Sequence, residues 1–293
     1  MRVSNQMIYN NLSEYLMQNN AALLQPESQI ASGDKISQPS DNPIGYSQIV
    51  NLNSISGTLN QYMTNQNVAQ GFMSATNSAL DQASSILSDI NSIALNAASG
   101  LTNQNKQGDS TQLAGDLQSL LAVANTQYQG EYLFAGFKNN APAYNNAGVY
   151  QGDGGQINVD IGPGATIQRN LPGQNVFGTA SGGVDIFATI QSLQAAITGN
   201  NQAGIQSSLA SLSSAQQQIL NSQGILAANV TGVKSAQSYV QSLSETNTNL
   251  LSQTQSVDMN STITQLNQQM TSLQAVQAMA SKVMGLSLVN FLK

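Results

Sequence analysis

The sequence predicts a mainly α-helical protein: an elongated helical bundle or coiled coil of its N- and C-terminal segments, with a small central β-rich domain. The first observation is the position of proline, which breaks helix interiors at a cost of about 3 kcal/mol. Residues 44–141 and 173–293 contain no proline, so long helices can lie there. The second is apolar residues at steps of three and four in both stretches. The third is the stretch 138–184, which is rich in Gly and Pro and alternates in short pieces.

The first proline-free stretch predicts two helices. Apolar side chains recur at helical spacing from Ile49 to Ala97, and a helix over 44–99 would be roughly 80 Å long at about 1.5 Å per residue. Gly100 offers a C-cap, after which 101–108 is predicted to be a polar loop. A second helix continues to about Ala124 and ends before Gly130.

The second half repeats this organisation. A short helix is predicted over Ile186–Ile197, and a long one begins near Ile205. Between the two halves, 156–161 and 166–168 alternate apolar and polar residues, as short strands joined by tight turns do. We therefore expect terminal helices at 1–30 and 262–293, a helical bundle domain of 31–137 and 185–261, and a β insertion at 138–184.

Both chain ends carry an apolar stripe on an almost uncharged helix, and neither stripe can be buried by its own helix. One arrangement pairs the two helices antiparallel and leaves spare apolar surface for neighbouring molecules. In the other, both ends simply complete the central bundle. The candidate contact residues are Val3, Met7, Leu12, Leu16, Ile263, Leu266, Met270, Leu273, Val283, Leu286 and Phe291.

The composition excludes several classes of function. Charged residues are 8% of the chain, the net charge is −6, and the eight Lys and Arg are scattered. Nucleic-acid binding is not expected, because it depends on neutralising phosphates. There is no Cys and no His, which excludes disulfides, thiolate metal sites, a Cys nucleophile and the usual catalytic base. Neutral amide and hydroxyl side chains take the place of charges, which suits either a soluble helical protein with an amide-rich coat or a surface that meets many copies of itself.

No motif for catalysis, cofactor binding or metal binding stands out, and we expect no enzyme activity. Lys35 in a Gly-Asp-Lys loop is typical of a solvated lysine, and the carboxylates of predicted helices favour N-termini and solvent. The stretch 152–156 is better explained as a hairpin turn than as a lone calcium repeat. The start lacks the apolar segment of a secretory signal peptide, and no run of 18 apolar residues predicts a membrane span.

Four segments, in the same order along the chain, resemble a known family. They are the opening Met1–Met7, the loop from Ile30 to Pro43, the passage Gly130–Phe137 followed by Tyr150–Asp153, and the ending Leu286–Leu292. Together they are similar to the hook–filament junction proteins (hook-associated protein 3) of the flagellin superfamily. The residues of the family loop are Gly33, Pro39, Ser40, Asp41 and Pro43. Asp34 replaces a basic residue of the family, Asn42 replaces an Asp, and Pro26 interrupts the helix pattern.

The resemblance implies a structural protein of the bacterial flagellum. It implies a ring of copies between hook-associated protein 1 and the flagellin filament, with terminal helices that are unstructured in the monomer. It also implies export through the flagellar type III system without a cleaved signal, and a chaperone on the C-terminal helix. The alternatives are a minor flagellin that forms filaments, or a secreted adhesin with a β head on a helical stalk.

Overall fold

The computed structural model describes residues 2–99, 106–180 and 182–291, with the side chains of 2–6, 8 and 283–291 outside this description. The fold class predicted from the sequence is confirmed: within these residues the protein is mainly helical with two small antiparallel sheets. The helices are α1 (Arg2–Ser32), α2 (Pro43–Ala98), α3 (Lys106–Ala124), α4 (Gly173–Val176), α5 (Ile186–Thr198), α6 (Gln202–Gln255) and α7 (Met259–Phe291). The strands are β1 (Gln127–Tyr128), β2 (Glu131–Tyr132), β3 (Asn158–Gly162) and β4 (Ala165–Gln168).

The chain divides into two compact units. The first unit holds Met1–Thr58 and Leu243–Lys293, and the second holds Leu59–Ser242. Both long helices, α2 and α6, therefore contribute to each unit. These limits differ from the domain boundaries expected at 30 and 262, which stay a prediction.

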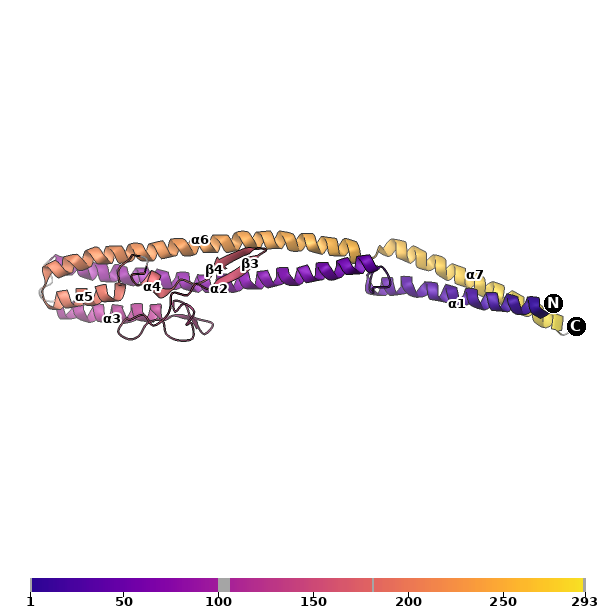
Figure 1. Ribbon diagram of the computed structural model, residues 1–293, viewed down its shortest axis with the longest axis horizontal. Coiled ribbons are helices and arrows are strands. Elements are labelled where there is room, and N and C mark those ends of the chain that lie inside the picture. Colours follow the sequence, from indigo (N-terminus) through magenta and orange to yellow (C-terminus); the bar gives the residue numbers. More distant parts are fainter. Residues whose placement is uncertain (1, 100–105, 181, 292–293) are drawn as a thin grey trace. The chain divides into compact units, whose positions relative to one another are not determined.

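The first unit is built on two antiparallel helix pairs. Helix α1 packs along α7, and the start of α1 lies beside the end of α7 (Figure 1). In the second pair, the buried amide of Asn247 on α6 donates to the carbonyl oxygen of Leu52 on α2 at 2.9 Å and to Ser56 Oγ at 2.7 Å. These hydrogen bonds hold the two long helices together without any charge.

The second unit has a continuous apolar core. Leu80, Leu87 and Ile90 of α2 are fully buried with Leu113 and Leu120 of α3. Helix α5 is the third helix that contributes to this core, and α6 is the fourth. The residues of α6 in the core are Leu212, Ile219, Leu226 and Val233. This packing explains the predicted apolar spacing of the long helices.

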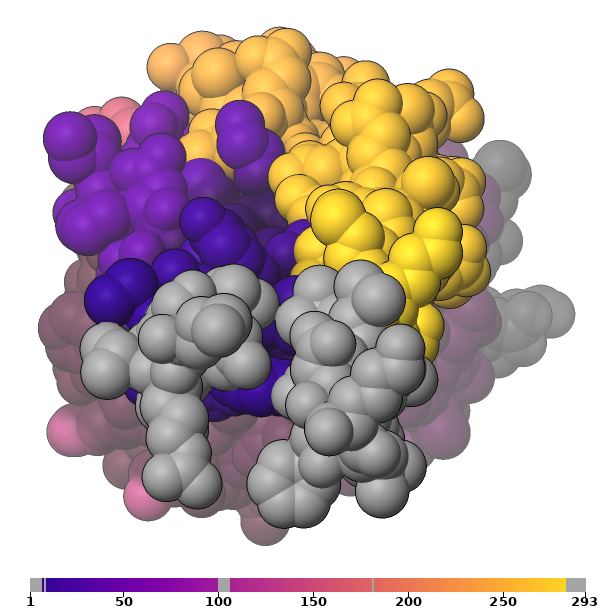
Figure 2. Space-filling model, turned by 90° about the vertical axis from the view of Figure 1, so that its right-hand side faces the viewer, coloured from indigo at the N-terminus to yellow at the C-terminus, as the bar shows by residue number. Residues whose placement is uncertain are grey.

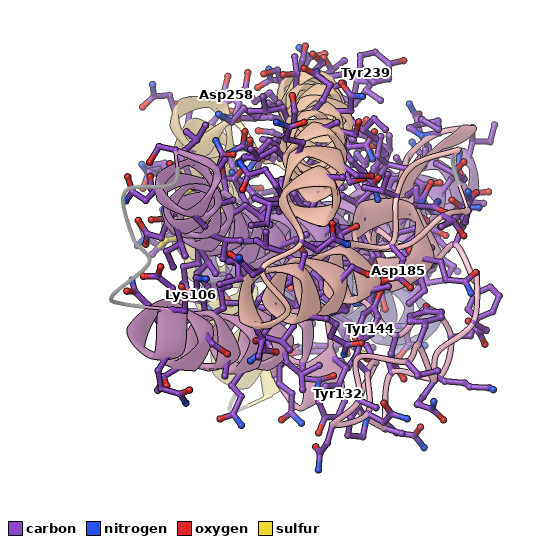
Figure 3. The ribbon with its side chains drawn as sticks, turned by 90° about the vertical axis from the view of Figure 1, so that its left-hand side faces the viewer. Lys106, Tyr132, Tyr144, Asp185, Tyr239 and Asp258 are labelled. Carbon is purple, nitrogen blue, oxygen red and sulfur yellow. The ribbon has the colours of Figure 1, made fainter. Side chains whose placement is uncertain are left out.

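An aromatic cluster joins the β insertion to this core. The ring of Phe177 lies 5.2 Å from that of Phe134 and 5.9 Å from that of Phe187, between ring centroids. Tyr144 lies among the loops beside α5, whose N-cap Asp185 is also labelled (Figure 3). The strands expected near 156–161 and 166–168 are present as β3 and β4. The insertion shares the helical core, however, so the packing does not support treating 138–184 as a separate body.

The ion pair between Arg169 and Glu131 lies beside this core. The Arg169 guanidinium bonds the Glu131 carboxylate at 2.6 Å and lies 4.9 Å from the centroid of the Phe72 ring. Arg169 follows β4 and Glu131 lies in β2, so the pair ties both sheets to α2. The short strands β1 and β2 were not predicted, because two-residue strands leave no alternating pattern.

Helix α1 corrects one expectation. Pro26 was expected to interrupt it, but α1 continues through Pro26 to Ser32. Proline removes one intrahelical hydrogen bond, yet the Pro26 ring is buried, and burial of apolar surface offsets part of that cost. Helix α3 also begins at Lys106, inside the stretch predicted as a loop.

Candidate assembly surface of the terminal helices

Helices α1 and α7 form a seam with coiled-coil spacing. Along α1 the buried or half-buried positions alternate at steps of three and four, and along α7 they do the same. This is the spacing that two-helix packing requires. The α1 positions are Tyr9, Leu12, Leu16, Asn19, Leu23, Pro26 and Ile30, and the α7 positions are Thr262, Leu266, Gln269, Leu273, Val276 and Ala280.

The structure divides the predicted contact residues into two groups. Leu12, Leu16, Leu266 and Leu273 are half-buried in the seam. Three others lie outside it: Met7 is 59% exposed, Ile263 43% and Met270 45%. Thr262 and Gln269, which an apolar count passes over, take the neighbouring seam positions. The role of Met7, Ile263 and Met270 as assembly contacts stays a prediction.

Four of the predicted contacts cannot be placed at the level of side chains. Val3, Val283, Leu286 and Phe291 lie in the outer turns of α1 and α7, where side chains are outside the described part of the structure. Viewed from the end that carries both termini, the remaining indigo residues of α1 lie against the yellow residues of α7 (Figure 2).

Three exposed apolar residues of α7 form a stripe beside the seam. Met259, Ile263 and Met270 fall within a narrow arc of the helix at about 100° per residue, and each is more than 40% exposed. Between Met259 and Ser281, α7 carries no charged side chain. A surface of this kind can pack against apolar helices without the repulsion that repeated like charges would produce.

A hydrogen-bonded joint links the base of this pair to the long helices. Gly33 ends α1 with φ of +77°, a conformation that favours glycine, and its amide donates to the Gln29 carbonyl oxygen at 2.9 Å. The Gly33 carbonyl accepts from the Val257 amide at 3.0 Å, and the Lys35 amide donates to the Gln255 carbonyl oxygen at 2.6 Å. The break between α1 and α2 is thereby bonded to the break between α6 and α7.

The family loop continues as a turn organised by Asp41. One carboxylate oxygen accepts the amides of Ser37 at 3.0 Å and Gln38 at 3.1 Å, together with the Ser37 hydroxyl. The backbone hydrogen bonds from Ser37 and Gln38 lower the pKa of Asp41 below its usual value. Pro39 and Ser40 are exposed at the tip of this turn.

Asn42 caps the start of α2. Of the three adjacent residues that can cap a helix, Ser40, Asp41 and Asn42, it is Asn42 whose Oδ1 accepts the Gly45 amide, at 3.0 Å. Pro43 occupies the first helical position, as its fixed φ favours. The Asn that departs from the family pattern therefore keeps the capping role of an Asp. Residue type alone does not separate three adjacent capping candidates.

Two further residues of the surface escaped sequence reasoning. Asp258 begins α7, where its Oδ1 accepts the amides of Asn260 at 3.0 Å and Ser261 at 3.2 Å. Asn19 lies inside the seam and accepts a hydrogen bond from Ser272 at 3.1 Å. An Asp immediately before an apolar helical pattern, as at Asp258, is an N-cap signal that could have been found. The Asn19 contact joins residues far apart in the sequence and leaves no local signal.

The described residues show neither a metal-binding cluster nor a membrane-spanning helix. Among the described residues, no group of three His, Cys, Asp or Glu side chains gathers where it could hold a metal ion. No helix in that part of the chain is both long and apolar enough to span a bilayer. A cavity of about 460 Å³ lies in the second unit between α6 and the insertion and is lined largely by amides and hydroxyls.

The described residues thus combine a pair of long terminal helices, which expose apolar side chains and carry few charges, with a second, helical unit that contains two small sheets. Residues 3–139 match the family described as the bacterial flagellin N-terminal helical region. The chain is 26% identical to flagellar hook-associated protein 3 of Escherichia coli (strain K12), over 100% of both chains.

Two other comparisons agree with this similarity to hook-associated protein 3. The chain is 27% identical to flagellar hook-associated protein 3 of Salmonella typhimurium (strain LT2), over 60% of this chain and 57% of that relative. It thus spans little more than half of that protein. A solved structure of a flagellar hook-associated protein from Vibrio parahaemolyticus shares the fold, with a TM-score of 0.68 and 21% identity, over 74% of this chain and 100% of that chain. These findings confirm the resemblance to hook-associated protein 3 and the predicted class of function, a structural protein of the flagellum.

Proposed function

We propose that this chain is the subunit that joins the hook to the flagellin filament. The observation that carries the proposal is the α1–α7 pair, whose seam is apolar and whose flank exposes Met259, Ile263 and Met270. The full-length similarity to hook-associated protein 3 of E. coli supports this role over that of a generic helical stalk. In the junction, copies form a ring that contacts hook-associated protein 1 on one side and flagellin on the other.

The same surface also bears on how the free chain is kept soluble and exported before assembly. An exposed apolar stripe on α7 needs a cover while the chain is free, and an export chaperone on the C-terminal helix would provide one. Export through the flagellar type III system, without a cleaved signal, would deliver the chain to the tip of the hook. The terminal helices would then acquire their full set of apolar neighbours only in the assembled ring.

The proposal is tested by placing charge in the seam. Leu266→Asp with Leu273→Asp should abolish attachment of the chain to flagellin filament ends, because burying an unpaired carboxylate is strongly unfavourable. The matched control is Thr264→Asp with Gln268→Asp, which adds the same charge at exposed positions of the same helix. Attachment is counted by electron microscopy. Equal attachment by the seam variant and the control would contradict the proposal.

One observation favours a second candidate, a minor flagellin. The matching family description is that of flagellin itself, over residues 3–139. The two roles differ in growth. A flagellin adds to itself without limit, whereas a junction subunit has different partners on its two sides.

A further inference from the structure

Methionine is concentrated at the two ends of the chain. Seven of the nine methionines fall within residues 1–32 and 259–291, where α1 and α7 lie. The side chains of five of these seven belong to the described part of the structure, and each of the five is more than 40% exposed. They are Met7, Met17, Met259, Met270 and Met279. In the second unit, by contrast, Met73 is fully buried.

The exposed methionines lie on several faces of their helices. At about 100° per residue, Met259 and Met270 share one face of α7, whereas Met279 lies on the opposite face. Their exposure does not depend on the pairing of α1 with α7, because a side chain that is exposed in the closed pair stays accessible when the pair opens. A small solute therefore reaches these sulfur atoms in either state of the free chain.

Methionine is also the side chain of this protein that a peroxide oxidises most readily. The chain contains no Cys, no Trp and no His, so the other readily oxidised side chains are absent. Hydrogen peroxide transfers one oxygen atom to the thioether sulfur. The S–O bond forms as the O–O bond breaks, the sulfur loses two electrons, and the second peroxide oxygen leaves as water. The product, methionine sulfoxide, is polar, whereas methionine is flexible and apolar.

We propose that these five methionines form an oxidation site that determines whether the free chain can assemble. The inference rests on the proposed junction role, in which copies pack side by side through their terminal helices. Packing removes water from the side chains between neighbours, and a sulfoxide buried there without a hydrogen-bond partner is unfavourable. Because Met259 and Met279 lie on opposite faces, oxidation alters both sides of α7. Peroxide thus bars a free chain from the ring, and reduction of the sulfoxides readmits it.

The positions of oxidation are measured on the full free chain. The chain is exposed to hydrogen peroxide, catalase ends the reaction, and mass spectrometry of its peptides gives the rate at each methionine. Each of the five exposed methionines should gain one oxygen atom at least tenfold faster than Met73, because Met73 is buried in the core of the second unit. Equal rates at the five positions and at Met73 overturn the proposal.

Attachment to flagellin filament ends measures the consequence. The oxidised chain, freed of peroxide before the filaments are added, should attach at least tenfold less than the untreated chain, as counted by electron microscopy. Methionine sulfoxide reductases A and B, which act on the two sulfoxide epimers, should restore attachment. An untreated chain that does not attach contradicts the proposed junction role itself. Attachment that survives oxidation, or a loss that the reductases do not reverse, contradicts the oxidation site alone.

Leucine variants assign the loss to these positions. The test variant combines Met7→Leu, Met17→Leu, Met259→Leu, Met270→Leu and Met279→Leu. Peroxide should reduce its attachment less than twofold, relative to the same variant without treatment. The matched control is Met63→Leu with Met73→Leu, which removes the two thioethers of α2 and should lose as much attachment on oxidation as the unchanged chain. A tenfold loss in the five-leucine variant, or protection in the α2 variant, overturns the proposal.

Discussion

At the scale of single residues, Asp41 and Asp116 stand out as carboxylates in a chain with only 8% charged residues. Asp41 organises the turn between α1 and α2, and Asp116 on α3 has a buried oxygen without a hydrogen-bond partner. The first is stabilised as a carboxylate and the second is not. Their pKa values therefore move in opposite directions, and so do their effects on stability.

Acidification should release the turn at Asp41. Hydrogen bonds from the Ser37 and Gln38 amides lower the pKa of Asp41 in the folded chain below its ordinary value. Its contribution is therefore fully present above the unfolded pKa of about 3.9 and is lost as the pH falls through the lower folded pKa. The amide proton shifts of Ser37 and Gln38, followed by NMR, should titrate together with a midpoint below the unfolded value. A midpoint at or above the unfolded value would argue against this hydrogen bonding, and so would amide shifts that titrate in Asp41→Asn as they do in the unchanged chain.

Neutralising Asp116 should stabilise the second unit near neutral pH. Partial burial raises the pKa of Asp116, and the charge of Asp89 raises it further. A raised folded pKa means that the stabilising contribution is present at low pH and is lost as the pH rises through that pKa. Asp116→Asn should raise the thermal midpoint at neutral pH by an amount equivalent to at most about 1 kcal/mol. The gain should shrink on acidification, and a gain that is independent of pH would refute the assignment.

At the scale of elements, the insertion is part of the main core and should be needed for its stability. Phe177 is fully buried between Phe134, Tyr144 and Phe187. Phe177→Ala should therefore lower the free energy of unfolding by about 3–5 kcal/mol. Phe137→Ala is the control, because Phe137 is 64% exposed and its loss should cost no more than about 0.5 kcal/mol. Denaturant titration measures both, and similar small losses would show that the insertion folds apart from the helices.

The terminal helices should be the least protected elements of the free chain. Their seam is mostly half-buried rather than buried, and such segments open at low free energy. Hydrogen exchange should show residues 1–30 and 262–293 exchanging much faster than Leu80–Ile90 of α2. Strong protection at both ends would instead favour a pair that is already complete in the monomer.

The sequence was most informative about long elements and least informative about contacts between them. Proline-free stretches and apolar spacing located α2 and α6 within a few residues, because many periodic positions act together. The sequence pattern around Pro26 wrongly predicted an interruption of α1, because the burial of the Pro26 ring depends on packing against α7, which is distant in the sequence. The seam positions Thr262 and Gln269 were not recognised, because spacing alone does not show which of two neighbouring stripes faces the partner helix. Asn19 and Ser272 were missed for the same reason.

At the scale of the whole molecule, the two ends of the chain meet in one helix pair that carries few charges. The second unit has its own aromatic core, and amide hydrogen bonds such as that of Asn247 join the long helices α2 and α6. This organisation would suit the proposed ring of copies, since neutral contacts do not repel when many copies are brought together. The central claim is that such a chain joins two polymers and does not extend one.

Electron microscopy of the purified chain with flagellin seeds tests this claim most directly. The chain is added at high concentration to short flagellin filaments, and the length of added material at each filament end is measured. The account predicts that filament ends gain about one layer of subunits and then stop, because the two sides of the subunit fit different partners. Long filaments made of this chain alone would contradict the account and assign the chain to the filament-forming flagellins.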